Sequence, residues 1–111
     1  MLEKEFVPYN LAKQIKQLGF KQECFGYYID VEVANPFLVK NIVSDDQGGY
    51  FTLAPLYQQA FRWLWNKTGK YIIPIQKDDK EWLAIGIVYK TYEEAELECL
   101  KKLIEIVKNK L

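Results

Sequence analysis

Apolar residues recur at helical spacing near both ends of the sequence. Residues 10–18 place apolar side chains on one helical face, with Asn10 as the expected N-cap and Gly19 just past the expected end. Residues 91–94, TYEE, match the capping-box pattern, and apolar positions then recur at helical spacing as far as Leu111. The sequence therefore predicts a helix in each of these two segments.

A third helix is predicted in the middle of the chain, at PLYQQAFRWLWNKTG (residues 55–69). Pro55 at or near its start and Gly69 just past its end follow the usual preference for proline at helix entry and glycine at helix exit. Its apolar arc is wider than an ordinary surface helix needs. The polar positions that remain are Gln58, Gln59, Arg62 and Asn66.

Alternating residues predict four strands that pair as two hairpins: residues 24–33 with 37–43, and 71–76 with 82–89. In the first strand, Phe25 and Tyr27 face one way, whereas Cys24, Gly26 and Tyr28 face the other. Residues 44–49, SDDQGG, have the composition of a loop. Pro74 has no amide hydrogen for a ladder bond, so its strand is expected at a sheet edge or with a bulge.

The expected order is helix, hairpin, helix, hairpin, helix, which predicts an α+β fold. We expect a single domain over residues 1–111, with the helices packed mostly on one face of a four-stranded, mainly antiparallel sheet. Half of the residues are apolar and 15% are aromatic, which is enough to form a core.

The charge composition is balanced, with 15 basic and 15 acidic residues. Arg62 is the single arginine, and arginine is the residue that best recognises phosphate and guanine. These features disfavour nucleic acid and anionic membranes as partners. One alternative stays open, in which lysines of the first and last helices form a nucleic-acid-binding patch. No apolar run approaches the roughly 20 residues of a membrane span, and the start MLEKEFVPYN lacks a signal-peptide apolar region.

Side chains with catalytic or metal-binding chemistry are few. The chain contains no histidine, and we interpret its two cysteines, Cys24 and Cys99, as reduced and buried thiols of a cytoplasmic protein. The aspartate pairs at 45–46 and 78–79 fall in expected turns, where aspartate is favoured for backbone reasons. We therefore predict no catalytic residue, no metal, no cofactor and no small-molecule substrate. The alternative is an enzyme that uses carboxylates.

The aromatic content suggests an interaction surface. Trp, Tyr and Phe number 3, 8 and 6, more than a core of this size is expected to hide. Arg62 lies among tryptophans, and Arg, Trp and Tyr dominate interface energetics. Either Arg62 is simply a solvated or ring-stacked side chain on a core helix, or it belongs to a partner-binding edge. The candidate partner-binding residues are Gln58, Arg62, Trp65 and Tyr28.

Several phrases also support a family resemblance: EFVPYNLAKQIKQLGF, CFGYY, QQAFRW and YEEAELECLKKLIEIVKNK. Between Glu5 and Lys110 the chain resembles a family of small proteins from Bacteroides-type gut bacteria and from their phages and mobile elements. The family has no established activity, so the resemblance assigns no catalytic or binding residue. It implies an intracellular accessory protein of phage or prophage origin. We predict that the protein is non-catalytic and acts by binding another protein or itself, including as a homodimer.

Overall fold

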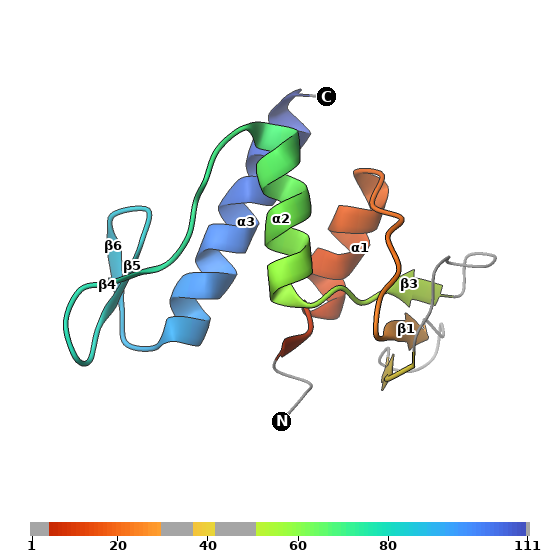
Figure 1. Ribbon diagram of the computed structural model, residues 1–111, viewed down its shortest axis with the longest axis horizontal. Helices are drawn as coiled ribbons and strands as arrows, with labels where there is room; N and C mark the ends of the chain where they lie inside the picture. Colours follow the sequence, from red (N-terminus) through yellow and green to blue (C-terminus); the bar gives the residue numbers. More distant parts are fainter. Residues whose placement is uncertain (1–4, 30–36, 42–50, 111) are drawn as a thin grey trace. The chain divides into compact units, whose positions relative to one another are not determined.

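The computed structural model describes residues 5–29, 37–41 and 51–110 (Figure 1). The elements follow in the order α1 (Tyr9–Gln17), β1 (Tyr27–Ile29), β2 (Phe37–Val39), β3 (Phe51–Leu53), α2 (Tyr57–Thr68), β4 (Ile75–Gln76), β5 (Trp82–Ala84), β6 (Ile87–Tyr89) and α3 (Tyr92–Lys110). The chain divides into two compact units, residues 1–60 and 61–111. The α+β class is confirmed, but the single four-stranded sheet is wrong, because each unit contains its own three-stranded antiparallel sheet.

Helix α1 begins one residue earlier than predicted. The carbonyl of Pro8 accepts hydrogen bonds from the amides of Leu11 and Ala12, at 3.1 and 2.9 Å. Pro8 therefore occupies the N-cap position, and the expectation that Asn10 caps this helix is wrong, because Asn10 already lies in its first turn. Proline suits a helix entrance because its φ is fixed and its missing N–H costs no hydrogen bond there.

The predicted end of α1 is confirmed in detail. Gly19 adopts a φ of 105°, in the left-handed region that glycine tolerates best. Its amide donates to the carbonyl of Lys16 at 3.0 Å, and the Phe20 amide donates to the carbonyl of Ile15 at 3.3 Å. This pair of bonds is the Schellman motif, and the Phe20 side chain is buried as the motif favours.

The sheet of the first unit has the order β2-β1-β3. The predicted hairpin pairing of β1 with β2 is present, and α1 packs against β3. Strand β3 was not predicted, because three residues are too short to show an alternating pattern. The loop predicted at 44–49 lies outside the described residues, as do residues 30–33 of the first predicted strand.

The alternation predicted for residues 24–26 is present in the burial of these residues, but the apolar ring of Phe25 lies on the exposed side. Phe25 is 57% exposed, whereas Cys24 is buried. Gly26 is also buried, and a β-carbon at this position would lie 2.9 Å from Cε1 of Phe6. The strand itself begins only at Tyr27, three residues later than predicted.

The sheet of the second unit has the order β4-β5-β6. The strand predicted over residues 82–89 is instead two strands joined by a turn at Ile85 and Gly86, which have φ values of 55° and 82°. Positive φ at both central residues is typical of the type I′ hairpin turn. The sequence hides this turn because isoleucine favours strands and rarely adopts positive φ. Pro74 immediately precedes β4, and β4 is an edge strand as expected.

Helix α3 begins at the predicted capping box. The Glu94 amide donates to Oγ1 of Thr91 at 3.1 Å, and Oγ1 of Thr91 donates to Oε1 of Glu94 at 3.0 Å. The β5 and β6 strands pack against α3, and the ring of Trp82 lies edge-on to that of Tyr92 with centroids 4.9 Å apart. The core of the second unit is formed by buried side chains of α2, β5 and α3: Phe61, Leu64, Ala84, Ala95, Cys99, Leu100, Leu103, Ile104 and Val107.

Candidate functional site

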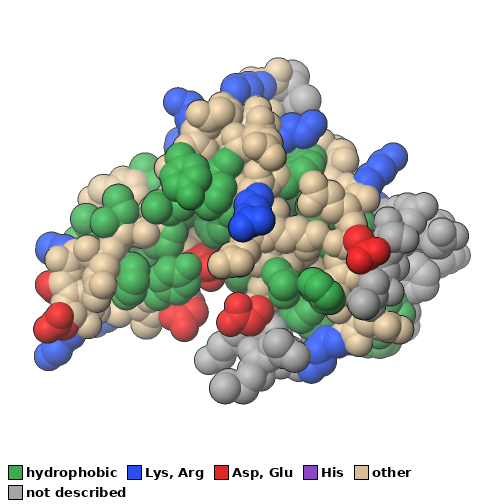
Figure 2. All heavy atoms as spheres, viewed as in Figure 1, with side chains coloured by type: hydrophobic (Ala, Val, Ile, Leu, Met, Phe, Trp, Pro, Cys, Tyr) green, Lys and Arg blue, Asp and Glu red, His purple; other side chains and the backbone are tan. Residues whose placement is uncertain are grey.

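An open groove of about 420 Å³ lies at the C-terminal end of α2, within the second unit. It is lined by side chains of the last turns of α2 and of the segment that follows: Arg62, Trp65, Asn66, Gly69, Lys70 and Tyr71. We call these residues the α2-end groove. Figure 2 shows basic and hydrophobic side chains next to each other over α2. The lining residues include two cations, Arg62 and Lys70, and two aromatic residues, Trp65 and Tyr71.

The end of α2 determines which residues reach the groove. Gly69 has a φ of 71°, and its amide donates to the carbonyl of Trp65 at 2.8 Å. Oγ1 of Thr68 donates to the carbonyl of Leu64 at 2.9 Å and accepts a hydrogen bond from the amide of Lys70 at 3.1 Å. These bonds end the helix and turn the chain, so the residues after Gly69 lie beside the last turns of α2.

The aromatic wall of the groove is held by ring contacts and one hydrogen bond. Nε1 of Trp65 donates to the carbonyl of Ile72 at 3.1 Å. The Trp65 ring stacks on Phe61 with centroids 5.6 Å apart, and lies 4.1 Å from the ring of Tyr71 at an angle of 33°. Tyr71 is 71% exposed, whereas Trp65 is half-buried. Trp65 thus positions Tyr71, and Tyr71 presents the accessible ring.

The groove is electropositive. Arg62 is exposed, and its guanidinium has no hydrogen bond or ion pair with any described residue. No acidic residue belongs to the α2-end groove. Between Asp46 and Asp78 the sequence contains no acidic residue, and its charged positions are Arg62, Lys67, Lys70 and Lys77. The positive charge of the groove is therefore not compensated by neighbours along the chain.

Two of the four partner-binding residues predicted from the sequence, Arg62 and Trp65, line this groove. Gln58 is exposed one turn earlier on α2 and is not a lining residue. Lys70 and Tyr71 belong to the groove but were not predicted. The absence of acidic residues on both sides of them is the signal in the sequence that could have drawn attention to this segment.

Tyr28, the fourth predicted residue, makes contacts within the first unit. Its hydroxyl donates to the carbonyl of Val7 at 2.7 Å, and its ring lies edge-on to Tyr9 with centroids 5.5 Å apart. Burial raises the pKa of the Tyr28 hydroxyl. These contacts give Tyr28 a role in attaching β1 to the start of α1.

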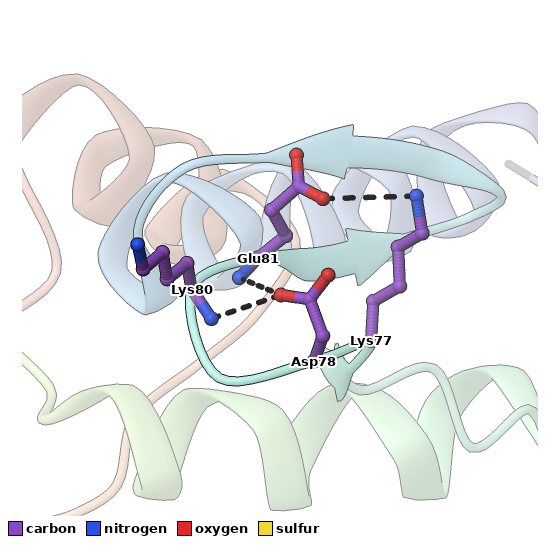
Figure 3. Close-up of polar contacts among 4 residues, drawn as sticks. All are labelled: Lys77, Asp78, Lys80 and Glu81. Atoms are coloured by element: carbon purple, nitrogen blue, oxygen red, sulfur yellow. Dashed lines mark hydrogen bonds and ion pairs between the residues drawn. The ribbon is translucent and has the colours of Figure 1, made fainter.

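The aspartate pair at 78–79 lies in the turn between β4 and β5 (Figure 3). Oδ1 of Asp78 accepts hydrogen bonds from the amides of Lys80 and Glu81, both at 2.9 Å, and Nζ of Lys77 lies 3.7 Å from Oε1 of Glu81. The hydrogen bond from the Lys80 amide is the main cause that lowers the pKa of Asp78. Asp78 therefore stabilises the turn, which is the backbone role expected of aspartate there.

An open hollow of about 580 Å³ beside this turn is lined by Asp78, Asp79, Lys80, Glu81 and Lys90. A carboxyl group that acts as a general acid near neutral pH needs a raised pKa, and that of Asp78 is lowered. Across the described residues, no three His, Cys, Asp or Glu side chains are grouped as metal ligands.

Both cysteines are buried free thiols. Burial raises the pKa of Cys24 to about 12 and that of Cys99 to about 11, with nearby glutamates adding smaller contributions. The thiolate is the reactive form, so both side chains are poor nucleophiles at neutral pH.

The lysines of α3 have acidic neighbours, as the sequence predicts. Nζ of Lys101 lies 3.1 Å from Glu98, and Nζ of Lys102 lies 3.5 Å from Glu105. These pairs reduce the positive potential that a nucleic-acid-binding helix would need.

Within the described part of the chain, no helix combines the length and the apolar composition needed to cross a membrane. The family resemblance is carried by the sequence phrases alone and stays a prediction. Comparisons with protein-family models, with curated proteins and with solved structures find no match for this chain.

Proposed function

We propose that this protein is a non-catalytic binding protein whose α2-end groove contacts another protein. In this proposal it is a cytoplasmic accessory protein of phage or prophage origin, as the sequence resemblance implies. Alternatively, the same groove binds a second copy of this chain, as in a homodimer. No cofactor takes part in either form.

One observation carries the proposal: Arg62 and Tyr71 are both exposed and line the same groove, although neither is buried in the core. Arginine, tryptophan and tyrosine are the residues most enriched among interface hot spots. The ring of Tyr71 is already ordered against Trp65, so binding would cost little additional side-chain entropy.

The nucleic-acid alternative has weaker support. Its predicted surface uses the lysines of the first and last helices. On α3, Lys101 and Lys102 are paired with glutamates, and Lys110 donates to the carbonyl of Thr68 at 3.2 Å. The hollow beside the β4–β5 turn likewise gives little support to a carboxylate enzyme, because Asp78 has a lowered pKa and hydrogen bonds to the backbone.

The test compares the wild-type protein with Arg62→Glu and with Lys67→Glu. Both variants reverse one exposed charge on the same helix, but Lys67 is not a groove residue. Light scattering over a range of concentrations measures self-association, and capture from a lysate of the source cells measures binding to other proteins. We expect Arg62→Glu to abolish the association and Lys67→Glu to retain it. A strictly monomeric protein with no specific partner, or equal association by both variants, would contradict the proposal.

A further inference from the structure

We propose that the α2-end groove binds an acidic peptide segment in which a carboxylate side chain lies next to an aromatic or large aliphatic one. This inference rests on the proposed function, because it names the chemistry of the partner at the same site. In this inference Arg62 and Lys70 bind the carboxylate of the peptide, and the ring of Tyr71 contacts its apolar side chain.

Charge complementarity indicates that the ligand is negatively charged. Arg62 and Lys70 both line the groove, and none of its described lining residues is acidic. A guanidinium can bind a carboxylate through two parallel hydrogen bonds, and such charge-assisted bonds are about twice as strong as neutral ones. A basic or neutral segment would leave both cations uncompensated.

The end of a helix normally disfavours a nearby anion, because its last carbonyl groups carry partial negative charge. At the end of α2 the carbonyls of Trp65 and Thr68 already accept hydrogen bonds. The carbonyl of Leu64 accepts from Thr68, that of Trp65 from the Gly69 amide, and that of Thr68 from Nζ of Lys110. Neither Arg62 nor Lys70 forms an ion pair with a described residue, so both can bind an external anion.

The aromatic wall favours a peptide over a nucleic-acid strand. Single-stranded nucleic acids bind along a basic groove in which successive bases stack on successive exposed rings. Here Trp65 is half-buried and already in contact with the rings of Phe61 and Tyr71, so Tyr71 provides the accessible ring of the groove. A groove that is lined by this ring and by two cations, Arg62 and Lys70, suits one apolar side chain beside a carboxylate.

The experiment follows the indole N–H signals of the 3 tryptophans in ¹⁵N–¹H NMR spectra while a peptide is added. The probes are acetylated and amidated Gly-Glu-Phe-Glu-Gly, its counterpart with Gln in place of both Glu residues, and a short oligothymidylate. The signals of Trp63 and Trp82 serve as internal controls, because these residues do not line the groove.

We expect the Glu peptide to shift the Trp65 signal and the Gln peptide to bind at least about tenfold more weakly, as the loss of one charge-assisted contact predicts. Arg62→Ser should abolish the shift, and Lys67→Ser should retain it. Both variants give spectra that show whether the fold is intact.

Equal affinity for the two peptides, an unchanged Trp65 signal, or tighter binding of the oligothymidylate would overturn the inference. The two proposals fail in different ways. Association in the lysate that depends on Arg62, without binding of the Glu peptide, would refute the acidic ligand but leave the proposed function standing. If neither the Arg62-dependent association nor the binding of the Glu peptide is observed, both the proposed function and the acidic ligand are refuted.

Discussion

In α3 two lysines, Lys101 and Lys102, pair with glutamates of the same helix, whereas α2 contains no acidic residue with which its cations could pair. Helix α3 begins with the Thr91–Glu94 capping box, with glutamates in its first turn and lysines in its last turn. Both groups are favourably placed with respect to the helix dipole. The charged residues at the two ends of α3 therefore stabilise the helix itself.

The large side chains of the two helices differ in the same way. The large apolar side chains that α3 buries are aliphatic, such as Leu100 and Leu103, which are completely buried. Helix α2 buries Phe61 and Leu64 but leaves Trp63 and Trp65 half-exposed. Large side chains that are not buried in the core contribute less to stability and are therefore the better candidates for function. The comparison of the two helices places such side chains on α2.

The largest expected effect tests whether the buried side chains of α2 and α3 contribute equally to the core of the second unit. Leu103→Ala in α3 should lower the free energy of unfolding by about 2–5 kcal/mol, and Phe61→Ala in α2 by about 3–5 kcal/mol, because both leave cavities. Tyr71→Ala removes an exposed ring and should cost at most about 1 kcal/mol, the value of its contact with Trp65. Urea unfolding followed by circular dichroism measures all three. A loss at Tyr71 as large as that at Leu103 would show that the wall of the groove belongs to the core.

The sequence predicted the helices better than the sheets. The 3.6-residue period extends over nine to nineteen residues in these helices, and glycine marks the ends of α1 and α2. The sheets depend on strands of two or three residues, which are too short to show a period. The turn at Ile85 uses a residue with the opposite preference, so local sequence could not reveal it.

Two of the six residues that line the groove could be predicted in the same way. Arg62 and Trp65 are conspicuous because they are rare residues at the polar edge of an apolar helix. Tyr71 joins them only because Gly69 turns the chain, and Trp65 then binds the Ile72 carbonyl. These are tertiary contacts, so helical periodicity, which ends at Thr68, contains no information about them.

An intermediate effect tests the capping of α3. Thr91→Ala removes the oxygen that accepts the hydrogen bond of the Glu94 amide and should cost about 1 kcal/mol of unfolding free energy. Thr91→Ser keeps this oxygen and serves as the control. Thermal unfolding of both variants would show the difference. If Thr91→Ala were as stable as Thr91→Ser, the capping box would contribute nothing to α3.

The smallest expected effects on stability come from removing one charge in each helix, and their dependence on salt should distinguish α3 from α2. Glu98→Ala breaks the pair with Lys101 and should cost about 0.2–0.5 kcal/mol at low salt, and less at high salt because ions screen the pair. Arg62→Ala breaks no ion pair with a described residue, so its effect on unfolding should be within about 0.5 kcal/mol and should not depend on salt.

In binding, the order of the two effects should be reversed. Arg62→Ala should weaken binding of the Glu peptide, because Arg62 lines the groove, whereas Glu98→Ala should leave it unchanged, because Glu98 does not. Unfolding in urea at low and high salt, together with titration of the Glu peptide, measures both properties on the same samples. A salt-dependent loss of stability in Arg62→Ala would mean that the guanidinium has an internal counter-charge. Arg62 would then resemble the paired charges of α3, and the reason for placing a binding surface at α2 would be lost.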